Sequence, residues 1–404
     1  MPFRRFSSLL RRVKPSKPAA VQAAQNEPLP PEQNLLNLRV HATSPAIIAA
    51  AELLHSRNRF LIRVRSTDGA EGVAVGSERL KFLAPLLTQR VLPFFVGADA
   101  RDVERLVDAV ARHESNYKLA GVALWSCVAG VEMALFDLLG KSTGKSVGEL
   151  LGGVLRPQIP VYLSSMRRDT TPAQEVALLA PRLAATGARA VKLKIGGRHG
   201  LFDAAPGRTE RLVALARRTF GEAVAILVDA NGSYTADQAI EIGRMLEGHG
   251  VLYFEEPCAW EDFEATKRVA DSLERVQIAG GEQDSSLEKF RWLTRHRGVD
   301  VITPDLLSNG GFIRTLRVVR LAAAAGLDVS FHSARSDFRA AYMLHLASAT
   351  PALTWPQEFL ADPPRSESWY GPNLTITAGK VATPTGPGLG IEIDPAILRR
   401  AKRM

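Results

Sequence analysis

Cysteine is scarce in this sequence, which holds only Cys127 and Cys258 among its 404 residues. Two cysteines cannot build the disulfide framework that small secreted domains need, so we expect a reducing, cytoplasmic setting. Apolar runs long enough to cross a membrane are also missing, and the N-terminus lacks the apolar core of a secretory signal. These absences predict a globular protein with no membrane partner, and the length is sufficient for two domains.

Acidic residues are missing from the start of the chain until Glu27, whereas basic residues are frequent there. We predict that residues 1–34 form a basic, disordered tail and a Pro-rich linker. An organellar transit peptide and a membrane- or nucleic-acid-binding arm are the alternatives for this tail. Six basic residues precede Glu27, and without them the net charge falls from +9 to +3, so the rest of the chain gives no reason to expect a nucleic-acid partner. They are Arg4, Arg5, Arg11, Arg12, Lys14 and Lys17.

Residues 35–155 mix strand and helix patterns and predict an α+β domain. The run RFLIRVRSTDGAEGVAVG (59–76) predicts a hairpin that turns at Asp68-Gly69. Further along, Val128, Val131 and Leu135 recur at helical spacing. Gly140 is predicted to end that helix.

From 156 to 365, short β-rich runs alternate with longer helical ones. Repeated strand–helix units imply a parallel sheet, and eight of them predict an α/β fold with a closed (β/α)8-type barrel. Residues 366–404 break this rhythm, and we expect them to return to the first domain as short strands and turns. The eight β-rich runs are IPVYLSS, RAVKLKIG, VAILVDANG, VLYFEEP, RVQIAGGEQ, VDVITPD, GLDVSFHS and ALTWPQEF.

Ionisable residues stand at or near the ends of seven consecutive predicted strands. One arrives with each strand–helix unit, at separations of 23 to 35 residues from Lys194 onward. Because the ends of the strands meet at one mouth of a barrel, these side chains are predicted to converge. The set consists of Lys192, Lys194, Asp229, Glu255, Glu282, Asp305, His332 and Glu358.

Each of these residues has an ordinary structural explanation when it is taken alone. A carboxylate after a strand is usually a loop residue or a helix cap, and a single histidine is more often structural than catalytic. Seven consecutive strands that end in this way are hard to explain by independent structural roles. We therefore interpret the set as one site, with a non-catalytic binding or scaffold barrel as the alternative of a different class.

Three carboxylates of the set, Asp229, Glu255 and Glu282, come from adjacent strands. Such groups would repel one another and raise each other's pKa unless a cation lay between them. Oxygen ligands with open coordination positions suit Mg²⁺. The sequence has no HExxH or CxxC motif that would favour zinc. We predict a Mg²⁺ site formed by these three residues.

Acid/base groups are predicted on both sides of this metal. Lys192 and Lys194 lie two apart on one strand and so point to the same face. An ammonium near a second ammonium and a dication is pushed toward neutrality, which would make Lys194 a general base. On the other side, a hydrogen bond to Asp305 would hold the His332 imidazole in one tautomer.

This layout suits the removal of a proton α to a carboxylate. A dication would stabilise the charge that develops on the carboxylate oxygens. Lys192 would touch the carboxylate of a small-molecule substrate, and Glu358, if protonated, would donate to it. Lys194 or His332 would remove the proton. The opposite group would return it, giving racemisation or epimerisation, or would protonate a β-hydroxyl leaving group, giving dehydration.

Six motifs make residues 35–400 resemble the enolase superfamily, specifically its mandelate racemase-type branch: KLK (192–194), VDAN (228–231), FEEP (254–257), GGEQ (280–283), PD (304–305) and FHS (331–333). The resemblance implies an N-terminal α+β capping domain and a modified barrel. It also implies that the three carboxylates bind Mg²⁺ and that Asn231 contacts a substrate oxygen. We further expect a homo-oligomer.

The resemblance also makes Lys194 a base and Asp305 with His332 a dyad. This dyad departs from the muconate-cycloisomerase-type branch, which would have a lysine on strand six. Specificity is expected to come from capping-domain loops at 42–58 and 70–82 and from the first barrel loop near Ser164–Arg168, with Ser164 contacting substrate. From what the branch commonly does, we expect dehydration of a polyhydroxylated sugar acid to a 2-keto-3-deoxy acid. Racemisation, epimerisation and cycloisomerisation are the alternatives.

Overall fold

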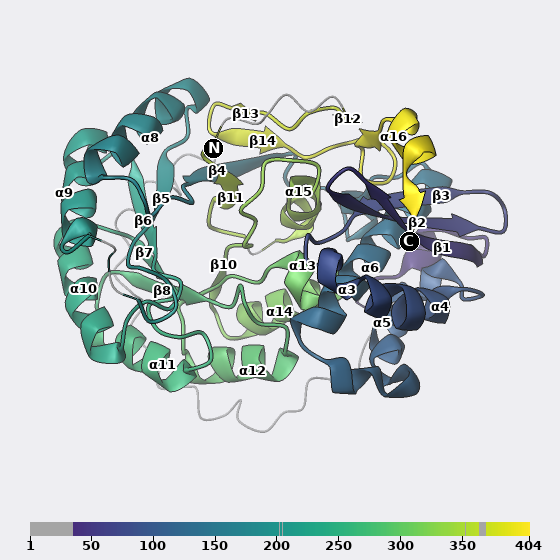
Figure 1. Cartoon of the computed structure of the whole chain (residues 1–404), viewed down its shortest axis with the longest axis horizontal. Coiled ribbons are helices and arrows are strands. Elements are labelled where there is room, and N and C mark those ends of the chain that lie inside the picture. Colours follow the sequence, from purple (N-terminus) through teal and green to yellow (C-terminus); the bar gives the residue numbers. More distant parts are fainter. Residues whose placement is uncertain (1–34, 202, 204, 352, 363–368) are drawn as a thin grey trace.

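A ring of strands and helices lies beside a smaller α+β part in the computed structural model of the chain (Figure 1). The structure describes residues 35–201, 203, 205–351, 353–362 and 369–404. The predicted tail at residues 1–34 lies outside the described residues. The C-terminal end of the chain lies against the α+β part (Figure 1).

The α+β part is built on an antiparallel sheet with the order β16-β1-β2-β3. Its strands are β1 (Ile48–Ser56), β2 (Arg59–Ser66), β3 (Glu71–Val75) and β16 (Lys402–Arg403). The predicted hairpin is confirmed, since β2 pairs with β3 around a turn in which Gly69 has a φ of 90°. The helices are α2 (Leu38–His41), α3 (Leu80–Leu86), η2 (Leu87–Val91), α4 (Leu92–Phe95), η3 (Ala100–Asp102), α5 (Val103–Arg112), η4 (His113–Leu119), α6 (Val122–Thr143) and α7 (Val147–Leu150).

Helix α6 is the central helix of this part and is buried on all sides from Leu124 to Gly140. The predicted helix end at Gly140 is wrong, because α6 continues to Thr143 and ends at Gly144, whose φ is 68°. Gly140 instead allows a close approach of two backbone segments. A Cβ at this position would lie 2.6 Å from the Cα of Gly388.

The expectation that no segment could span a membrane needs one correction in the described part of the chain. By length and composition alone, α6 would qualify. However, 89% of its most apolar window is buried inside the protein, as is usual for the core helix of a globular protein.

The eight predicted barrel strands are confirmed, and neighbours run parallel from β4 to β10. The strands are β4 (Gln158–Ser164), β5 (Ala190–Lys194), β6 (Ala225–Asp229), β7 (Tyr253–Glu255), β8 (Gln277–Gly280), β9 (Val301–Ile302), β10 (Asp328–Val329) and β11 (Gln357–Leu360). The helices between and around them are α8 (Pro172–Thr186), α9 (Arg208–Phe220), α10 (Ala236–Gly248), α11 (Phe263–Ser272), α12 (Leu287–His296), α13 (Leu306–Asn309), α14 (Phe312–Ala324) and α15 (Ala340–Ala349).

The ring closes through β11, which pairs in parallel with β4. Between β10 and β11, however, no strand pairing occurs among the described residues. Side chains of β11 bridge this seam instead. The backbone N–H of Phe331 donates to Gln357 Oε1 at 2.8 Å, and that of Ser333 donates to Glu358 Oε2 at 2.8 Å.

Alternating residues of the strands fill the inside of the barrel in layers. Register pairs Lys194 with Asp229 and Asp229 with Glu255, so these polar side chains lie at one level. The residues two and four positions earlier on β6, Leu227 and Ala225, belong to a separate apolar cluster. This cluster lies below the polar layer and also contains Tyr162, Ala190, Tyr253, Ala279, Val301 and Trp355.

The chain after the barrel returns to both parts of the molecule. Strands β13 (Ile376–Thr377) and β14 (Lys380–Ala382) extend the barrel sheet at β4, whereas β12 (Tyr370–Gly371) pairs with β15 (Glu392–Ile393). After α16 (Pro395–Arg400), the last strand β16 pairs antiparallel with β1. The α+β sheet is therefore completed by the C-terminal end of the chain.

Candidate active site

The three carboxylates predicted to bind a metal converge at the mouth of the barrel. Asp229 ends β6, Glu255 ends β7, and Glu282 follows β8. One oxygen from each lies within 4.8 Å of the others, and all three residues are buried. Glu255 Oε1 is buried without a hydrogen-bond partner among the described residues. Because a buried carboxylate oxygen without a partner is costly, this donor set fits a bound cation.

Electrostatics supports the same conclusion. Burial raises the pKa of Glu255 to about 7, and the nearby charges of Asp229 and Glu282 add to the shift although Lys192 opposes it. A divalent cation between the carboxylates would remove this repulsion.

The two lysines of β5 both point into the carboxylate layer, as their spacing predicts. Lys194 donates to Asp229 and, at 3.1 Å, to Asn231 Oδ1. Lys192 lies 2.5 Å from Glu255 and 2.8 Å from Glu358. Burial lowers the pKa of Lys192, but these carboxylates raise it well above its usual range. These contacts favour the charged form of Lys192.

Asp305 and His332 form the predicted pair at the opposite end of the triad. Asp305 Oδ2 lies 2.8 Å from His332 Nδ1, and it also accepts from Arg335 Nη1 at 3.1 Å. Burial raises the pKa of Asp305, but Arg335 and His332 hold it well below its usual range. The other ring nitrogen, His332 Nε2, lies 3.2 Å from Glu282 Oε2. The imidazole is thus oriented by Asp305 and faces the carboxylates.

The strand-eight acid, Glu358, is fully buried, and its side chain reaches Lys192 at 2.8 Å and His332 at 3.7 Å. Its Oε1 accepts from Ser164 Oγ at 2.7 Å and its Oε2 accepts from the backbone N–H of Ser333. Burial raises its pKa, but Lys192 and His332 hold that pKa well below its usual range. These neighbours favour the carboxylate form of Glu358 over the protonated donor that the sequence left open, and Ser164 contacts this carboxylate from within the barrel wall.

Asn231 occupies the centre of a network that the sequence indicated only in part. Its Nδ2 donates to Glu282 Oε1 at 3.2 Å and to Glu256 Oε2 at 3.3 Å. Asn231 and Glu256 both have left-handed backbone conformations, with φ values of 43° and 41°. Such strain is common at functional sites. The amide therefore links the metal-ligand candidate Glu282 to a fourth buried carboxylate.

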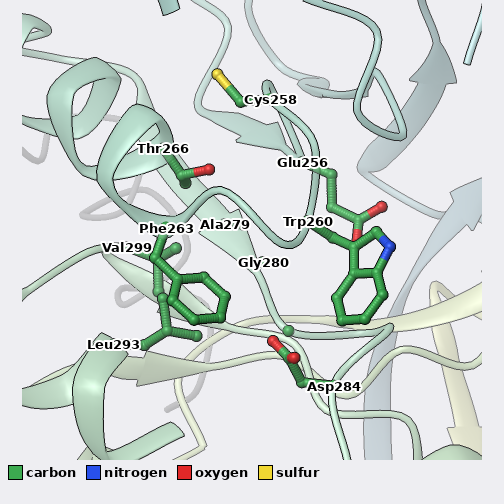
Figure 2. Close-up of a pocket in the computed structure, with 11 residues that line it drawn as sticks. Glu256, Cys258, Trp260, Phe263, Thr266, Ala279, Gly280, Asp284, Leu293 and Val299 are labelled. Carbon is green, nitrogen blue, oxygen red and sulfur yellow. The ribbon is translucent and has the colours of Figure 1, made fainter. Parts of the chain in front are cut away.

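A small pocket lies behind this fourth carboxylate (Figure 2). Figure 2 shows Glu256 and Asp284 at the pocket together with the Trp260 indole ring. Its volume is about 20 Å³, which is room for one water molecule. Glu256 Oε1 is buried without a hydrogen-bond partner among the described residues. Burial and the charge of Glu282 raise the pKa of Glu256 well above its usual range.

Two family profiles match almost the whole described chain. Residues 35–152 match the mandelate racemase / muconate lactonizing enzyme N-terminal domain, and residues 175–397 match the enolase C-terminal domain-like family. The chain belongs to the mandelate racemase and muconate lactonizing enzyme family of the enolase superfamily. The expected superfamily, and the expected fold of a capping domain with a modified barrel, are thereby confirmed.

Several relatives of this family member carry activities in their names. It is 29% identical to the arabinonate dehydratase of Saccharolobus solfataricus over 77% of its own length and 81% of that enzyme. It is 28% identical to the D-gluconate dehydratase of Thermoproteus tenax, covering 84% and 69% of the two chains. It is 27% identical to the D-galactarolactone cycloisomerase of Agrobacterium fabrum, covering 89% and 95%.

Solved structures of the family superpose closely on this chain. A racemase candidate from Roseobacter denitrificans is 37% identical, with a TM-score of 0.84 and coverage of 89% of this chain and 99% of that one. A mandelate racemase/muconate lactonizing protein from Paracoccus denitrificans, complexed with magnesium, is 26% identical, with a TM-score of 0.82 and coverage of 89% and 99%. This chain is therefore an enzyme of the superfamily, whose relatives act on small acids.

Sequence reasoning on this family member missed Glu256 and Arg335. Glu256 directly follows Glu255 in the FEEP motif, and its position beside a predicted ligand was the available signal. Arg335 follows His332 by three residues, and no spacing rule connects it with Asp305. Arg335 could be recognised only once the loop after β10 was placed beside the start of α13.

Proposed function

We propose that this protein is a Mg²⁺-dependent enzyme that removes the proton α to the carboxylate of a sugar acid and dehydrates it to a 2-keto-3-deoxy acid. The observation that carries this proposal is the triad of Asp229, Glu255 and Glu282 with an acid/base group at each end. Lys194 contacts Asp229, and His332 contacts Glu282. The dehydratase relatives support the choice of reaction.

Each residue of the site is assigned a role in the reaction according to its position. Lys194 or His332 accepts the α-proton, and the electron pair of the C–H bond moves toward the substrate carboxylate. When bound, Mg²⁺ would supply the charge that stabilises the carboxylate oxygens as they become more negative. Lys192 adds positive charge beside Glu255.

The second half of the reaction uses the opposite acid/base group. It protonates the β-hydroxyl group at C3. The electron pair from the former C–H bond then forms a C2–C3 double bond, the C3–O bond breaks, and water leaves. The enol that remains gains a proton at C3 and loses the proton of its C2 hydroxyl group, which gives the 2-keto-3-deoxy acid. Asp305 keeps the His332 ring oriented during this exchange, through the 2.8 Å contact at Nδ1.

A racemase, epimerase or cycloisomerase is the second candidate, because the same two groups could return the proton instead. The racemase candidate from Roseobacter denitrificans and the cycloisomerase from Agrobacterium fabrum favour it. A racemase would give substrate with inverted configuration at the α-carbon, and no keto acid.

The decisive experiment screens acid sugars with Mg²⁺ for keto-acid product and follows exchange of the α-hydrogen in D2O. We expect Lys194→Ala and His332→Asn each to lower turnover by about a hundredfold or more, since each removes an acid/base group. The variant that loses exchange as well identifies the group that removes the proton.

Two residues outside the site provide matched controls, the half-exposed Lys267→Ala on α11 and the exposed His296→Asn at the end of α12. Both should retain wild-type turnover and exchange. Unchanged turnover and exchange in Lys194→Ala and His332→Asn would show that the two bases are wrongly assigned. The absence of both product and exchange with every acid would favour a non-catalytic barrel.

A further inference from the structure

Arg168 lies at the mouth of the barrel beside the proposed base. It belongs to the loop between β4 and α8. Its Nη2 donates to Asn231 Oδ1 at 2.7 Å and lies 3.4 Å from the backbone oxygen of Asp229. Lys194 donates to the same Asn231 oxygen at 3.1 Å. Two cations therefore share one neutral acceptor at the edge of the carboxylate layer.

Arg168 has no counter-ion in the part of the chain that the structure describes. No carboxylate oxygen there lies within 4.0 Å of its guanidinium nitrogens, and its Nε is buried without a hydrogen-bond partner. Its neighbour Arg167 pairs with Asp362, and Arg335 pairs with Asp305. A partly buried charge without a counter-ion is costly. Arg167 and Arg335 avoid this cost through their ion pairs, whereas Arg168 does not.

The loop holds Arg168 in place instead of leaving it free in solvent. At its start, the backbone N–H of Ser165 donates to the oxygen of Lys192 at 3.0 Å. At its end, Thr170 Oγ1 donates to Glu175 at 2.7 Å, and the Thr170 oxygen accepts from Arg208 Nε at 2.8 Å. A guanidinium that is fixed before a ligand arrives loses less entropy on binding.

Two further arginines, Arg198 and Arg208, act on the charge of Arg168. Burial lowers the pKa of Arg168, and the charges of Arg198 and Arg208 lower it further, against the attraction of Asp229. An anion that contacts Arg168 would also be attracted by the charges of Arg198 and Arg208. The fork of an arginine matches the two oxygens of a carboxylate better than it matches a hydroxyl.

We infer that Arg168 binds a second carboxylate of the substrate, so that the enzyme prefers sugar acids with a carboxylate at both ends to those that end in a hydroxymethyl group. This inference rests on the proposed function, in which the first carboxylate lies at the triad. Arg168 is then a specificity-determining residue that contacts the end of the substrate where no bond changes.

The test uses pairs of acids that differ only in the terminal group, galactarate with galactonate and glucarate with gluconate. Affinity is measured with the Mg²⁺-loaded protein by thermal-shift titration, and KM and kcat are measured where product forms. The variants are Arg168→Met, Arg168→Lys and, as a matched control from the same loop, Arg167→Met.

We expect wild type to bind the diacid of at least one pair more tightly. Arg168→Met should weaken diacid binding by about ten- to a hundredfold, as for the loss of charge-assisted hydrogen bonds, with monoacid binding changed less than about threefold. Arg168→Lys should restore part of the preference, and Arg167→Met should keep all of it.

Tighter binding of the monoacid in both pairs would overturn the inference, as would an equal loss for both members in Arg168→Met. Absence of binding by all four acids would also overturn it. The proposed function fails separately, if no acid in a wider panel gives keto acid. In that case the thermal-shift comparison still decides the role of Arg168.

Discussion

At the level of single residues, the neighbours of Glu358 determine the pKa of its carboxyl group. Its two oxygens accept from Ser164 and Ser333, and Lys192 lies 2.8 Å away. The sequence predicted that this acid would reach the site, because it ends a β-rich run. It did not predict the lowered pKa of Glu358, which depends on Lys192 and His332 from other parts of the barrel.

Glu358→Gln should destabilise the metal-free protein by about 3 kcal/mol. The change leaves Lys192 without one of its buried counter-charges and places an amide N–H against donors. Urea denaturation in the presence of a chelator measures the difference. Glu288→Gln is the control, because Glu288 forms an exposed pair with Arg291 and should change stability by less than about 0.5 kcal/mol. A loss below about 1 kcal/mol for Glu358→Gln would contradict this view of the buried pair.

At the level of elements, the barrel strands were predictable because each is a buried β-rich run with an ionisable residue at or near its C-terminal end. Registers such as Lys194 with Asp229 follow from that pattern. The end of α6 was not predictable in the same way. Gly140 has the signature of a helix end, but a distant segment at Gly388 explains its lack of a side chain, and local sequence cannot reveal such a contact.

Gly140→Ala should therefore destabilise the protein by about 1–3 kcal/mol, although alanine normally favours a helix over glycine. The added Cβ would meet Gly388 and the Lys145 backbone oxygen at 2.6 Å. Gly248→Ala at the end of α10 is the matched control, since a Cβ there meets nothing within 4 Å. It should be neutral or stabilising by up to about 1 kcal/mol. Urea denaturation of both variants measures their free energies of unfolding. A Gly140→Ala variant more stable than wild type would refute the packing explanation.

At the level of the whole molecule, buried polar contacts join segments that are remote in sequence. His345 of α15 accepts from the Gly148 N–H at 3.1 Å through Nδ1, and its Nε2 lies 3.0 Å from the Leu389 oxygen. This pattern requires the neutral ring. The family and the fold were predictable from motifs spread over the chain, whereas links of this kind were not. A cytoplasmic location and a homo-oligomeric state stay predictions.

His345 should make stability depend on pH. Burial lowers its pKa to about 4, below the ordinary 6.5. The unfolded chain therefore binds the extra proton first, and the contribution of the neutral ring, complete above pH 6.5, is lost as the pH falls toward 4. Between pH 7 and pH 5 we expect a loss of about 2 kcal/mol.

Urea denaturation at several pH values measures this slope. His345→Gln should be less stable at pH 7 but should show a pH dependence that is shallower by about 2 kcal/mol over this range. His296→Gln, a change at an exposed histidine, should retain the wild-type slope. An unchanged slope in His345→Gln would assign the acid sensitivity to other groups.

The seam between β10 and β11 has a consequence for how this enzyme can diverge. The wall closes there largely through Gln357 and Glu358, and Glu358 also stands among the reacting groups. A lineage that exchanged this acid for another residue to suit a new substrate would lose the Ser333–Glu358 hydrogen bond across the seam and weaken the barrel wall there, unless a compensating change arose nearby. A substitution of Glu358 therefore affects both the site and the stability of the barrel. We expect such substitutions to occur together with a second change on a neighbouring element.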